Sequence, residues 1–195
     1  MELHPEFATI CHRLTKSAKL HKVNLTINAF RFVDPLFSFR EDVLSGKGAL
    51  QVNGRWHLKG FTRVVYLSTD PETALAEAMS SIRYFGFPDS KATPLVLVAV
   101  KVKIKGVLNL CLGKVRQRLK FSHSTIVNTD WRADNYSNRE SLTQAYGRAA
   151  YVTNFSGLLA PSAAPKNGTT IVAFPQQFAG SDELTIKKEV IWPKH

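Results

Sequence analysis

The sequence contains few cysteines and lacks the short motifs that identify most metal and cofactor sites. Its two cysteines, Cys11 and Cys111, stand about a hundred residues apart, a distribution that favours reduced thiols over a disulfide framework or a paired CxxC site. No HExxH or GxSxG motif occurs, and the GKG sequence at 46–48 lacks the third glycine of a dinucleotide-binding turn. The six histidines show no ligand spacing. We therefore expect no metal ion, and we interpret His57 and His123 as ordinary polar residues.

Long hydrophobic runs are also absent. No stretch approaches the roughly 18 apolar residues of a membrane helix, and residues 1–22 lack the continuous apolar segment of a secretory signal. A composition of 44% hydrophobic and 21% charged residues is typical of a soluble globular protein. No repeat, low-complexity tract or linker divides the chain, so its length favours one domain over residues 1–195. We expect a cytoplasmic protein with no membrane partner.

Acidic residues are in the minority, since 26 Lys and Arg against 15 Asp and Glu give a formal net charge of +11. The segment 90–129 contains no acid and eight basic residues. These are Lys91, Lys101, Lys103, Lys105, Lys114, Arg116, Arg118 and Lys120. Such a segment attracts nucleic acid, a phosphate-bearing small molecule or an acidic protein, and it is equally explained as a solvated face. Aromatic residues are not interleaved with it as stacking platforms, so direct nucleic-acid binding is the weakest of these alternatives.

Strand and helix patterns mix without the steady alternation of a doubly wound sheet, so we expect an α+β fold. Apolar residues at helical spacing predict an N-terminal helical extension over residues 1–22. Strands are predicted at 25–33, 63–68, 95–105, 171–174 and 184–192, a helix at 139–151, and a small-residue turn at 157–165. A further helix is predicted from 71 to 85, begun by Thr69 and Glu72 as a capping box with Pro71 in the first turn, and ended by Gly86.

Five residues on these predicted elements form a candidate binding site. They are Arg31 and Tyr66 on strands, Arg55 after a glycine, Glu77 on the helix that follows Tyr66, and Ser162 in a loop. Arginine binds pyrophosphate or carboxylate with its planar fork, tyrosine stacks on a heterocycle, and a carboxylate hydrogen-bonds ribose hydroxyls. The set suits a dinucleotide, and if the ribose carries a cationic leaving group the carboxylate can stabilise the oxocarbenium-like charge that develops.

The bland alternative for this set is that its members are ordinary surface residues. Glu77 points roughly 160° away from Leu75 on the predicted helix, outside the apolar stripe, where most glutamates are simply solvated. By spacing alone the five residues are therefore a weak signal.

Ordered motifs along most of the chain strengthen the candidate site. GRWHLKG at 54–60 and VVYLSTDPETALAE at 64–77, followed by DW at 130–131, TQAYG at 143–147 and GLLAPSA at 157–163, resemble the motifs of the RES-domain family over about residues 30–174. The resemblance implies a mixed or antiparallel β core with flanking helices, similar to the ADP-ribosyltransferase fold. It also implies a toxin of a bacterial Xre–RES toxin–antitoxin pair, for which NAD is the substrate and no cofactor is needed.

The resemblance implies a role for each of the five residues. Arg31 and Arg55 hold the substrate, Tyr66 stacks near the nicotinamide, Glu77 is the principal catalytic carboxylate, and Ser162 positions the ribose or the nicotinamide. Glu77, Arg55 and Ser162 make up the catalytic set. The tripeptide 139–141, which spells RES, is interpreted as a coincidence without a role.

The implied activity is cleavage of the nicotinamide–ribose bond, with water or phosphate as the acceptor, and the alternative is transfer of ADP-ribose to a protein. An Xre-type antitoxin is the expected partner, and nucleic acid is contacted only through it; a homodimer is left open. Two residues depart from the family's GGRWN motif: Asn53 replaces its first glycine and His57 its asparagine. Asn tolerates positive φ, which would preserve the turn, but the change to His57 leaves an inactive relative as a further alternative.

Overall fold

The computed structural model describes residues 1–16, 22–38, 43–92, 95–165 and 167–192. The strands are β1 (Lys22–Val33), β2 (Val65–Ser68), β3 (Leu95–Asn109), β4 (Gly157–Pro161), β5 (Thr169–Ala173) and β6 (Glu183–Trp192). The α-helices are α1 (Phe7–Lys16), α4 (Pro71–Tyr84), α5 (Gly113–Leu119), α6 (His123–Asn128), α7 (Trp131–Tyr136) and α8 (Leu142–Val152). Short 3-10 turns are η1 (Pro35–Phe37), η2 (Lys47–Leu50), η3 (Asp89–Ala92) and η4 (Pro175–Gln177).

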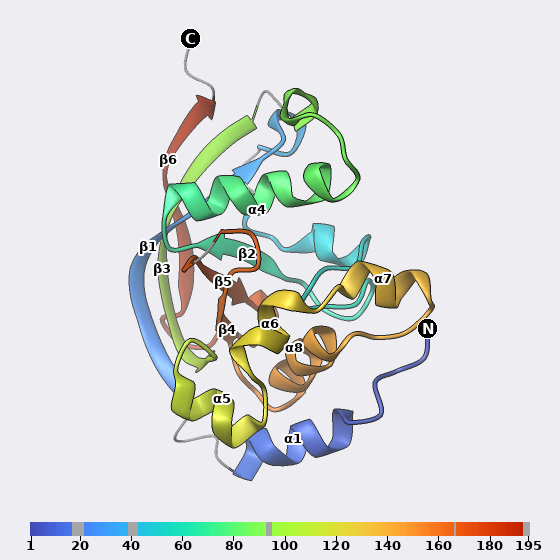
Figure 1. Cartoon of the computed structure of the whole chain (residues 1–195). Coiled ribbons are helices and arrows are strands. Elements are labelled where there is room, and N and C mark those ends of the chain that lie inside the picture. Colours follow the sequence, from blue (N-terminus) through green and yellow to red (C-terminus); the bar gives the residue numbers. More distant parts are fainter. Residues whose placement is uncertain (17–21, 39–42, 93–94, 166, 193–195) are drawn as a thin grey trace.

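The strands form one mixed sheet in the order β1-β2-β5-β4-β3-β6, with an additional pairing between β1 and β3. Five of the six pairings are antiparallel, and only β3 and β4 are parallel. The long strands β1, β3 and β6 lie together on one side, and the shorter β2, β5 and β4 lie between them and the helices (Figure 1). The expected α+β fold with a mixed β core and flanking helices is confirmed.

Two hydrophobic clusters fill the spaces on either side of the shorter strands. Adjacent residues of a strand point to opposite faces, and in β5 Ile171 belongs to the cluster shared with β1 and β3, while Val172 belongs to the cluster shared with α1, α5, α6 and α8. All five residues of β4 are buried. The stretch 157–161 was predicted as part of a turn, and this prediction is wrong because a short strand buried on both faces has no polar alternation to reveal it.

The other predicted elements agree with the structure except at their ends, whereas α5, α6 and α7 were not predicted. The predicted N-terminal helix is α1, with Ile10 and Leu14 buried, and residues 17–21 of the predicted extension lie outside the described residues. The helix predicted from 71 is α4, but Thr69 does not cap it; the side chain of Asp70 accepts a hydrogen bond from the Thr73 backbone N–H at 2.7 Å. An aspartate can cap as well as a threonine, and the sequence offers both in succession.

The tripeptide 139–141 has a structural role, which corrects its interpretation as a coincidence without one. Glu140 forms a buried ion pair with Arg148 at 2.8 Å, and it also accepts a hydrogen bond from the His4 backbone N–H. Ser141 and Gln144 form the capping box that begins α8, which is why this helix starts at Leu142 and not at Arg139. The N-terminus is thereby held beside α7 and α8 (Figure 1).

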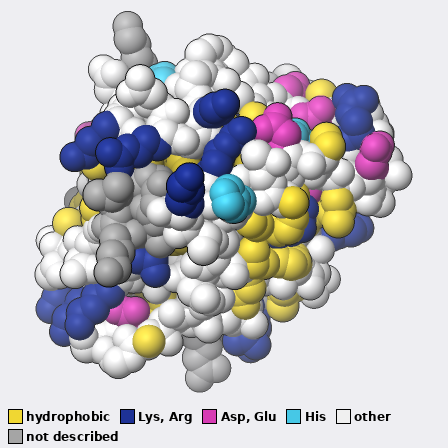
Figure 2. Space-filling view, turned by 90° about the horizontal axis from the view of Figure 1, so that it is seen from below, with side chains coloured by type: hydrophobic (Ala, Val, Ile, Leu, Met, Phe, Trp, Pro, Cys, Tyr) yellow, Lys and Arg dark blue, Asp and Glu magenta, His cyan; other side chains and the backbone are white. Residues whose placement is uncertain are grey.

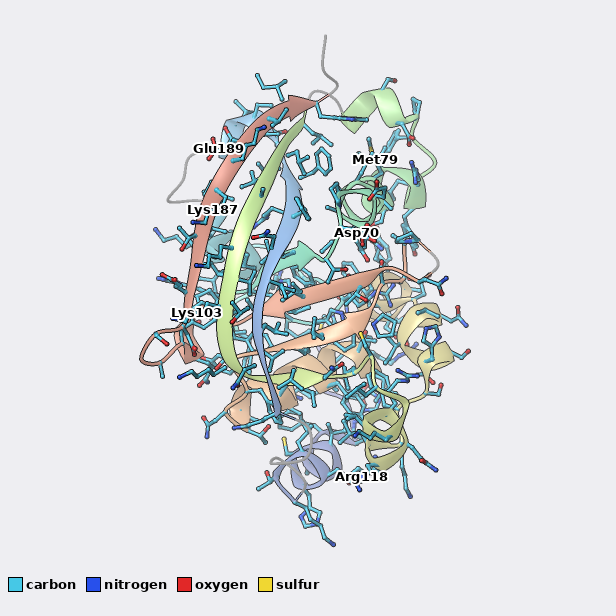
Figure 3. The ribbon with its side chains drawn as sticks, turned by 90° about the vertical axis from the view of Figure 1, so that its left-hand side faces the viewer. Asp70, Met79, Lys103, Arg118, Lys187 and Glu189 are labelled. Carbon is cyan, nitrogen blue, oxygen red and sulfur yellow. The ribbon has the colours of Figure 1, made fainter. Side chains whose placement is uncertain are left out.

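The basic segment 90–129 does not form one continuous surface. Lys103 lies on the long strand β3, whereas Arg118 lies on α5, at the end of the molecule that also carries α1 (Figure 3). Seen from that end, Lys and Arg side chains gather in several separate groups (Figure 2). Arg116 points back to the protein and donates to the carbonyls of Leu110 and Cys111. Within the described ranges, no helix has both the length and the apolar character needed to cross a bilayer.

Candidate active site

A cleft of about 920 Å³ opens between β2, α4, the segment around η2 and the start of α7. Arg31, Arg55, Tyr66 and Glu77 all line it. Ser162 reaches the same place through a hydrogen bond to the Glu77 carboxylate. The five residues predicted from the sequence are therefore brought together, although they come from five different segments of the chain.

Glu77 projects from α4 toward the strands that form the floor of the cleft. Its Oε1 accepts hydrogen bonds from the Ser162 Oγ and, at 3.3 Å, from the Thr170 Oγ1. Ser162 and Thr170 are only 6% and 5% exposed, so the carboxylate is oriented by two fixed hydroxyl donors. The alternative of a freely solvated helix glutamate is wrong. Thr170 was missed by the sequence analysis, because a threonine on a strand carries no motif of its own.

Arg55 is anchored by the end of α6. Its Nη1 donates to the carbonyls of Ile126 and Thr129, each at 3.0 Å. Burial lowers the pKa of the Arg55 guanidinium, and the neighbouring Glu77 carboxylate opposes this effect. The described hydrogen bonds of Arg55 use Nη1 alone, and the residue lines the cleft with a fixed positive charge.

Arg31 lies on β1 at the far end of the cleft. Its Nη1 donates to the Val43 carbonyl at 2.5 Å. Its Nε is buried and has no hydrogen-bond partner among the described residues, and burial lowers the pKa of this side chain to about 10. Arg31 also lines the cleft, where its guanidinium contributes positive charge.

Tyr66 and His57 both line the cleft and are joined by a hydrogen bond. The Tyr66 hydroxyl lies 3.0 Å from the Trp56 backbone N and 2.9 Å from the His57 Nδ1. The His57 Nε2 lies 3.0 Å from the Val52 carbonyl oxygen. His57 is only 4% exposed, so it is a buried polar residue with hydrogen-bond partners at both ring nitrogens. A single histidine without ligand spacing gave the sequence no indication of this contact.

Helix α8 supports the turn that carries Arg55. The Gln144 Nε2 donates to the Gly54 carbonyl at 3.0 Å. Gly147 leaves room for the Trp56 backbone, because a Cβ at this position would lie 1.9 Å from the Trp56 carbonyl oxygen. These contacts explain the TQAYG motif: it holds the GRWH turn against the helix.

The turn tolerates Asn53 for a reason other than the one expected. Asn53 is not among the described residues with positive φ; instead its Oδ1 accepts a hydrogen bond from the Lys59 backbone N–H at 2.8 Å. Gly54 is the constrained position, since a Cβ there would lie 2.4 Å from the His57 Cε1. The family's first glycine is thus replaced by a side chain that stabilises the loop.

The wall opposite η2 is formed by α7, which explains the DW motif. Trp131 and Arg132 line the cleft. Asp130 caps α7 by accepting the Ala133 N–H at 3.0 Å, and it also accepts a hydrogen bond from the Tyr84 hydroxyl of α4 at 3.1 Å. The Arg132 guanidinium lies 4.8 Å from the centre of the Tyr84 ring. Arg132 was not predicted, because only the tertiary contact between α4 and α7 brings it to the site.

The described residues do not form a metal-binding site. No group of three or more His, Cys, Asp and Glu side chains in the described ranges is arranged to hold a metal ion. Both cysteines are free, and burial raises the pKa of each thiol, which favours the neutral form. The residues that line the cleft include two carboxylates, Asp34 and Glu77, and three arginines, Arg31, Arg55 and Arg132.

Comparison with known proteins gives three similarities. The family model described as the RES domain matches residues 29–193. The NAD(+) phosphorylases MbcT of Mycobacterium tuberculosis and Mycobacterium bovis are 25% identical over 138 residues, which cover 70% of this chain and 69% of theirs. The crystal structure of the M. tuberculosis MbcT–MbcA toxin–antitoxin complex contains a chain that matches with a TM-score of 0.74 and 20% identity, over 93% of this chain and 91% of that one. At 20% identity, the similarity to this solved structure shows that the two chains share a fold.

Proposed function

Because this chain belongs to the RES-domain family, we propose that it is a toxin that degrades NAD by breaking the bond between nicotinamide and ribose. The observation that carries the proposal is the Glu77 carboxylate, which two buried hydroxyls orient within a cleft that Arg31 and Arg55 also line. The cleft volume of about 920 Å³ lies within the range of sites that enclose small molecules and cofactors.

The charges of the cleft suit the charges of NAD. We propose that Arg31 and Arg55, which both line the cleft, bind the pyrophosphate, since a guanidinium binds phosphate oxygens in a bidentate manner. Tyr66 offers the face of its ring to the nicotinamide. The position of Arg31 in the lining of the cleft supports an anionic ligand there.

The reaction that we propose follows from the position of the carboxylate. Nicotinamide leaves with the electron pair of the C–N bond and becomes neutral, and positive charge develops on the ribose ring. The Glu77 carboxylate stabilises this charge, and Ser162 and Thr170 hold the carboxylate in place. An oxygen of the acceptor then forms a bond to the ribose carbon, and the proton of the acceptor is released to solvent.

We propose inorganic phosphate as the acceptor. This choice is supported by the mycobacterial relatives, which are named NAD(+) phosphorylases. The arginines of the cleft suit a second anion beside the pyrophosphate. The alternative is transfer of ADP-ribose to a protein, which would use the same cleavage of the nicotinamide–ribose bond. We also propose that the fold resembles that of the ADP-ribosyltransferases, and this resemblance would agree with the alternative.

The partner that we propose is an antitoxin of the Xre type. One solved structure with a matching fold is a toxin–antitoxin complex, which supports the proposal of a protein that neutralises this one. Contact with nucleic acid would then be made by the antitoxin, in keeping with the separated groups of basic residues on this chain. A homodimer is a further proposal that gel filtration can test. The two free cysteines fit the reducing cytoplasm, which we propose as the location.

The decisive experiment measures nicotinamide release from NAD by the purified protein, with and without phosphate. Glu77→Gln keeps a carbonyl oxygen that can accept from Ser162 and Thr170 but removes the charge, so we expect the rate to fall about 10² to 10³-fold. Glu72→Gln, on the exposed side of the same helix, is the matched control and should keep the rate of the unmodified protein. An undiminished rate for Glu77→Gln would refute the mechanism.

The products distinguish the acceptors in the same experiment. Phosphorolysis predicts ADP-ribose carrying a phosphate on the ribose carbon that nicotinamide leaves, and a rate that rises with phosphate. Equal release of nicotinamide in phosphate-free buffer, with free ADP-ribose as product, would identify water as the acceptor. Labelling of a protein band by NAD labelled in its adenylate half would identify the transferase alternative.

A further inference from the structure

The proposed chemistry does not use the contact between His57 and the Tyr66 hydroxyl. We propose that His57 is a positioning residue, whose unprotonated Nδ1 accepts the hydroxyl proton of Tyr66 and fixes that ring against the turn that carries Arg55. Tyr66 then acts in the cleft through its ring and does not exchange a proton with substrate. The effect on catalysis rests on the proposed function, whereas the assignment of the hydrogen bonds does not.

The proton on the His57 ring is located by the groups around it. The Nε2 lies 3.0 Å from the Val52 carbonyl oxygen, which can only accept, so Nε2 carries the hydrogen. His57 is 4% exposed, and burial lowers its pKa to about 4, so the ring is neutral near pH 7. In a neutral imidazole the other nitrogen is an acceptor. Nδ1 therefore presents its lone pair to Tyr66.

With this assignment, the Tyr66 hydroxyl acts both as a hydrogen-bond donor and as a hydrogen-bond acceptor within the protein. The hydroxyl donates its only hydrogen to the His57 Nδ1 at 2.9 Å. It accepts the backbone N–H of Trp56 at 3.0 Å. Burial raises the pKa of Tyr66 above its ordinary value, so the phenol keeps its proton. A hydroxyl held in this way has no hydrogen to offer a substrate.

The same hydrogen bonds connect Tyr66 to Arg55. Trp56 directly follows Arg55, and the turn is closed by a backbone hydrogen bond from the Gly54 N–H to the His57 carbonyl at 3.1 Å. A Cβ on Gly54 would lie 2.9 Å from the Tyr66 hydroxyl and 2.4 Å from the His57 Cε1. The turn therefore fits around this pair without spare room, and a change at His57 or at the Tyr66 hydroxyl is transmitted to Arg55.

The proposal explains the departure of this chain from the family motif. The Nδ1 of histidine and the Oδ1 of asparagine are separated from Cα by the same number of bonds. An asparagine in this turn would place its carbonyl oxygen where Nδ1 stands, and it would accept the same hydroxyl proton. The change to His57 keeps the acceptor, so it gives no reason to regard the chain as an inactive relative.

The first test locates the proton directly. Nitrogen-15 NMR of histidine-labelled protein distinguishes a protonated from an unprotonated ring nitrogen, and the His57 signals are identified by their loss in His57→Asn. We expect, at neutral pH, a protonated Nε2 and an unprotonated Nδ1 whose shift changes in Tyr66→Phe. A protonated Nδ1, or a shift that is the same in Tyr66→Phe, would overturn the proposal whether or not the protein consumes NAD.

The second test compares side chains of nearly equal shape at position 57. Asparagine has the acceptor and leucine lacks it. We therefore expect the kcat/KM of His57→Asn for NAD to lie within about two-fold of that of the unmodified protein, and the kcat/KM of His57→Leu to be about ten-fold lower. Tyr66→Phe should lower it by a similar factor, and His57→Leu should add nothing in the Tyr66→Phe background. Equal losses for Asn and Leu, or losses that multiply, would refute the proposal. Failure of the unmodified protein to release nicotinamide would instead refute the proposed function.

Discussion

The close contact between Gly147 and the GRWH turn predicts that Gly147→Ala is destabilising, although alanine is the better helix former. An added Cβ would lie 1.9 Å from the Trp56 carbonyl oxygen and 2.7 Å from its carbonyl carbon. Contacts below 3.0 Å essentially never occur for Cβ atoms, so the helix and the turn would have to separate by at least 3.0 − 1.9 = 1.1 Å. The atoms in the way belong to the backbone, which cannot rotate aside.

The magnitude follows from two opposing effects. Replacing glycine by alanine inside a helix stabilises by about 1 kcal/mol. Overpacking a tight contact costs about 1 to 3 kcal/mol, and a backbone clash of this size lies at the upper end. We therefore expect the free energy of unfolding to fall by about 2 kcal/mol. Displacement of Trp56 also moves Arg55, and an error of about 1 Å at a catalytic group can cost up to about 10² in rate.

Urea denaturation of the purified protein measures the first effect, and nicotinamide release from NAD measures the second. Gly113→Ala is the matched control, because Gly113 is also helical and its added Cβ would meet only the Arg116 Nη2, at 3.9 Å. This variant should be as stable as the unmodified protein or more stable. A Gly147→Ala variant with an equal or higher free energy of unfolding would refute the argument that this glycine makes room for the turn.

Two further predictions concern buried charges. His57 has a pKa of about 4 in the folded state and 6.5 as a free side chain, so between these pH values the unfolded state binds more protons. The folded state therefore loses stability as the pH falls. Relative to His57→Asn, the unmodified protein should lose about 3 kcal/mol of unfolding free energy from pH 6.5 to 4, as measured by urea denaturation at each pH. Glu140→Ala leaves the buried Arg148 without its partner and should lower the free energy of unfolding by about 3 to 5 kcal/mol. Glu6→Ala removes a more exposed ion pair and should lower it by less than about 1 kcal/mol. Equal losses for the two variants in thermal or urea unfolding would contradict this prediction.

The residues of the candidate site could be named from the sequence because their chemistry is carried by motifs. Arg55, Tyr66 and Glu77 stand in continuous stretches whose order along the chain is distinctive, and the structure brings them to one cleft together with Arg31 and, through Glu77, Ser162. Their roles in catalysis stay predictions. Roles for Thr170, Gln144 and Arg132 were not predicted, because each depends on contacts with distant segments: Thr170 bonds to Glu77, Gln144 to the Gly54 carbonyl, and Arg132 lines the cleft beside Tyr84.

The amino-acid sequence by itself determined the local structure, the mixed α+β character and the identity of the chemical groups. Periodicity placed α4 and most of the strands, since apolar spacing reports which face of an element is buried. It could not reveal β4, which is buried on both faces and has no polar alternation.

Only the tertiary structure decided which donor meets which acceptor. It showed that Glu77, which spacing alone could not separate from a solvated glutamate, is an oriented carboxylate, and it placed the His57 Nδ1 within hydrogen-bond distance of the Tyr66 hydroxyl. The physical reason is that hydrogen bonding and desolvation depend on distances of about 3 Å between atoms far apart in the chain, and packing alone sets those distances.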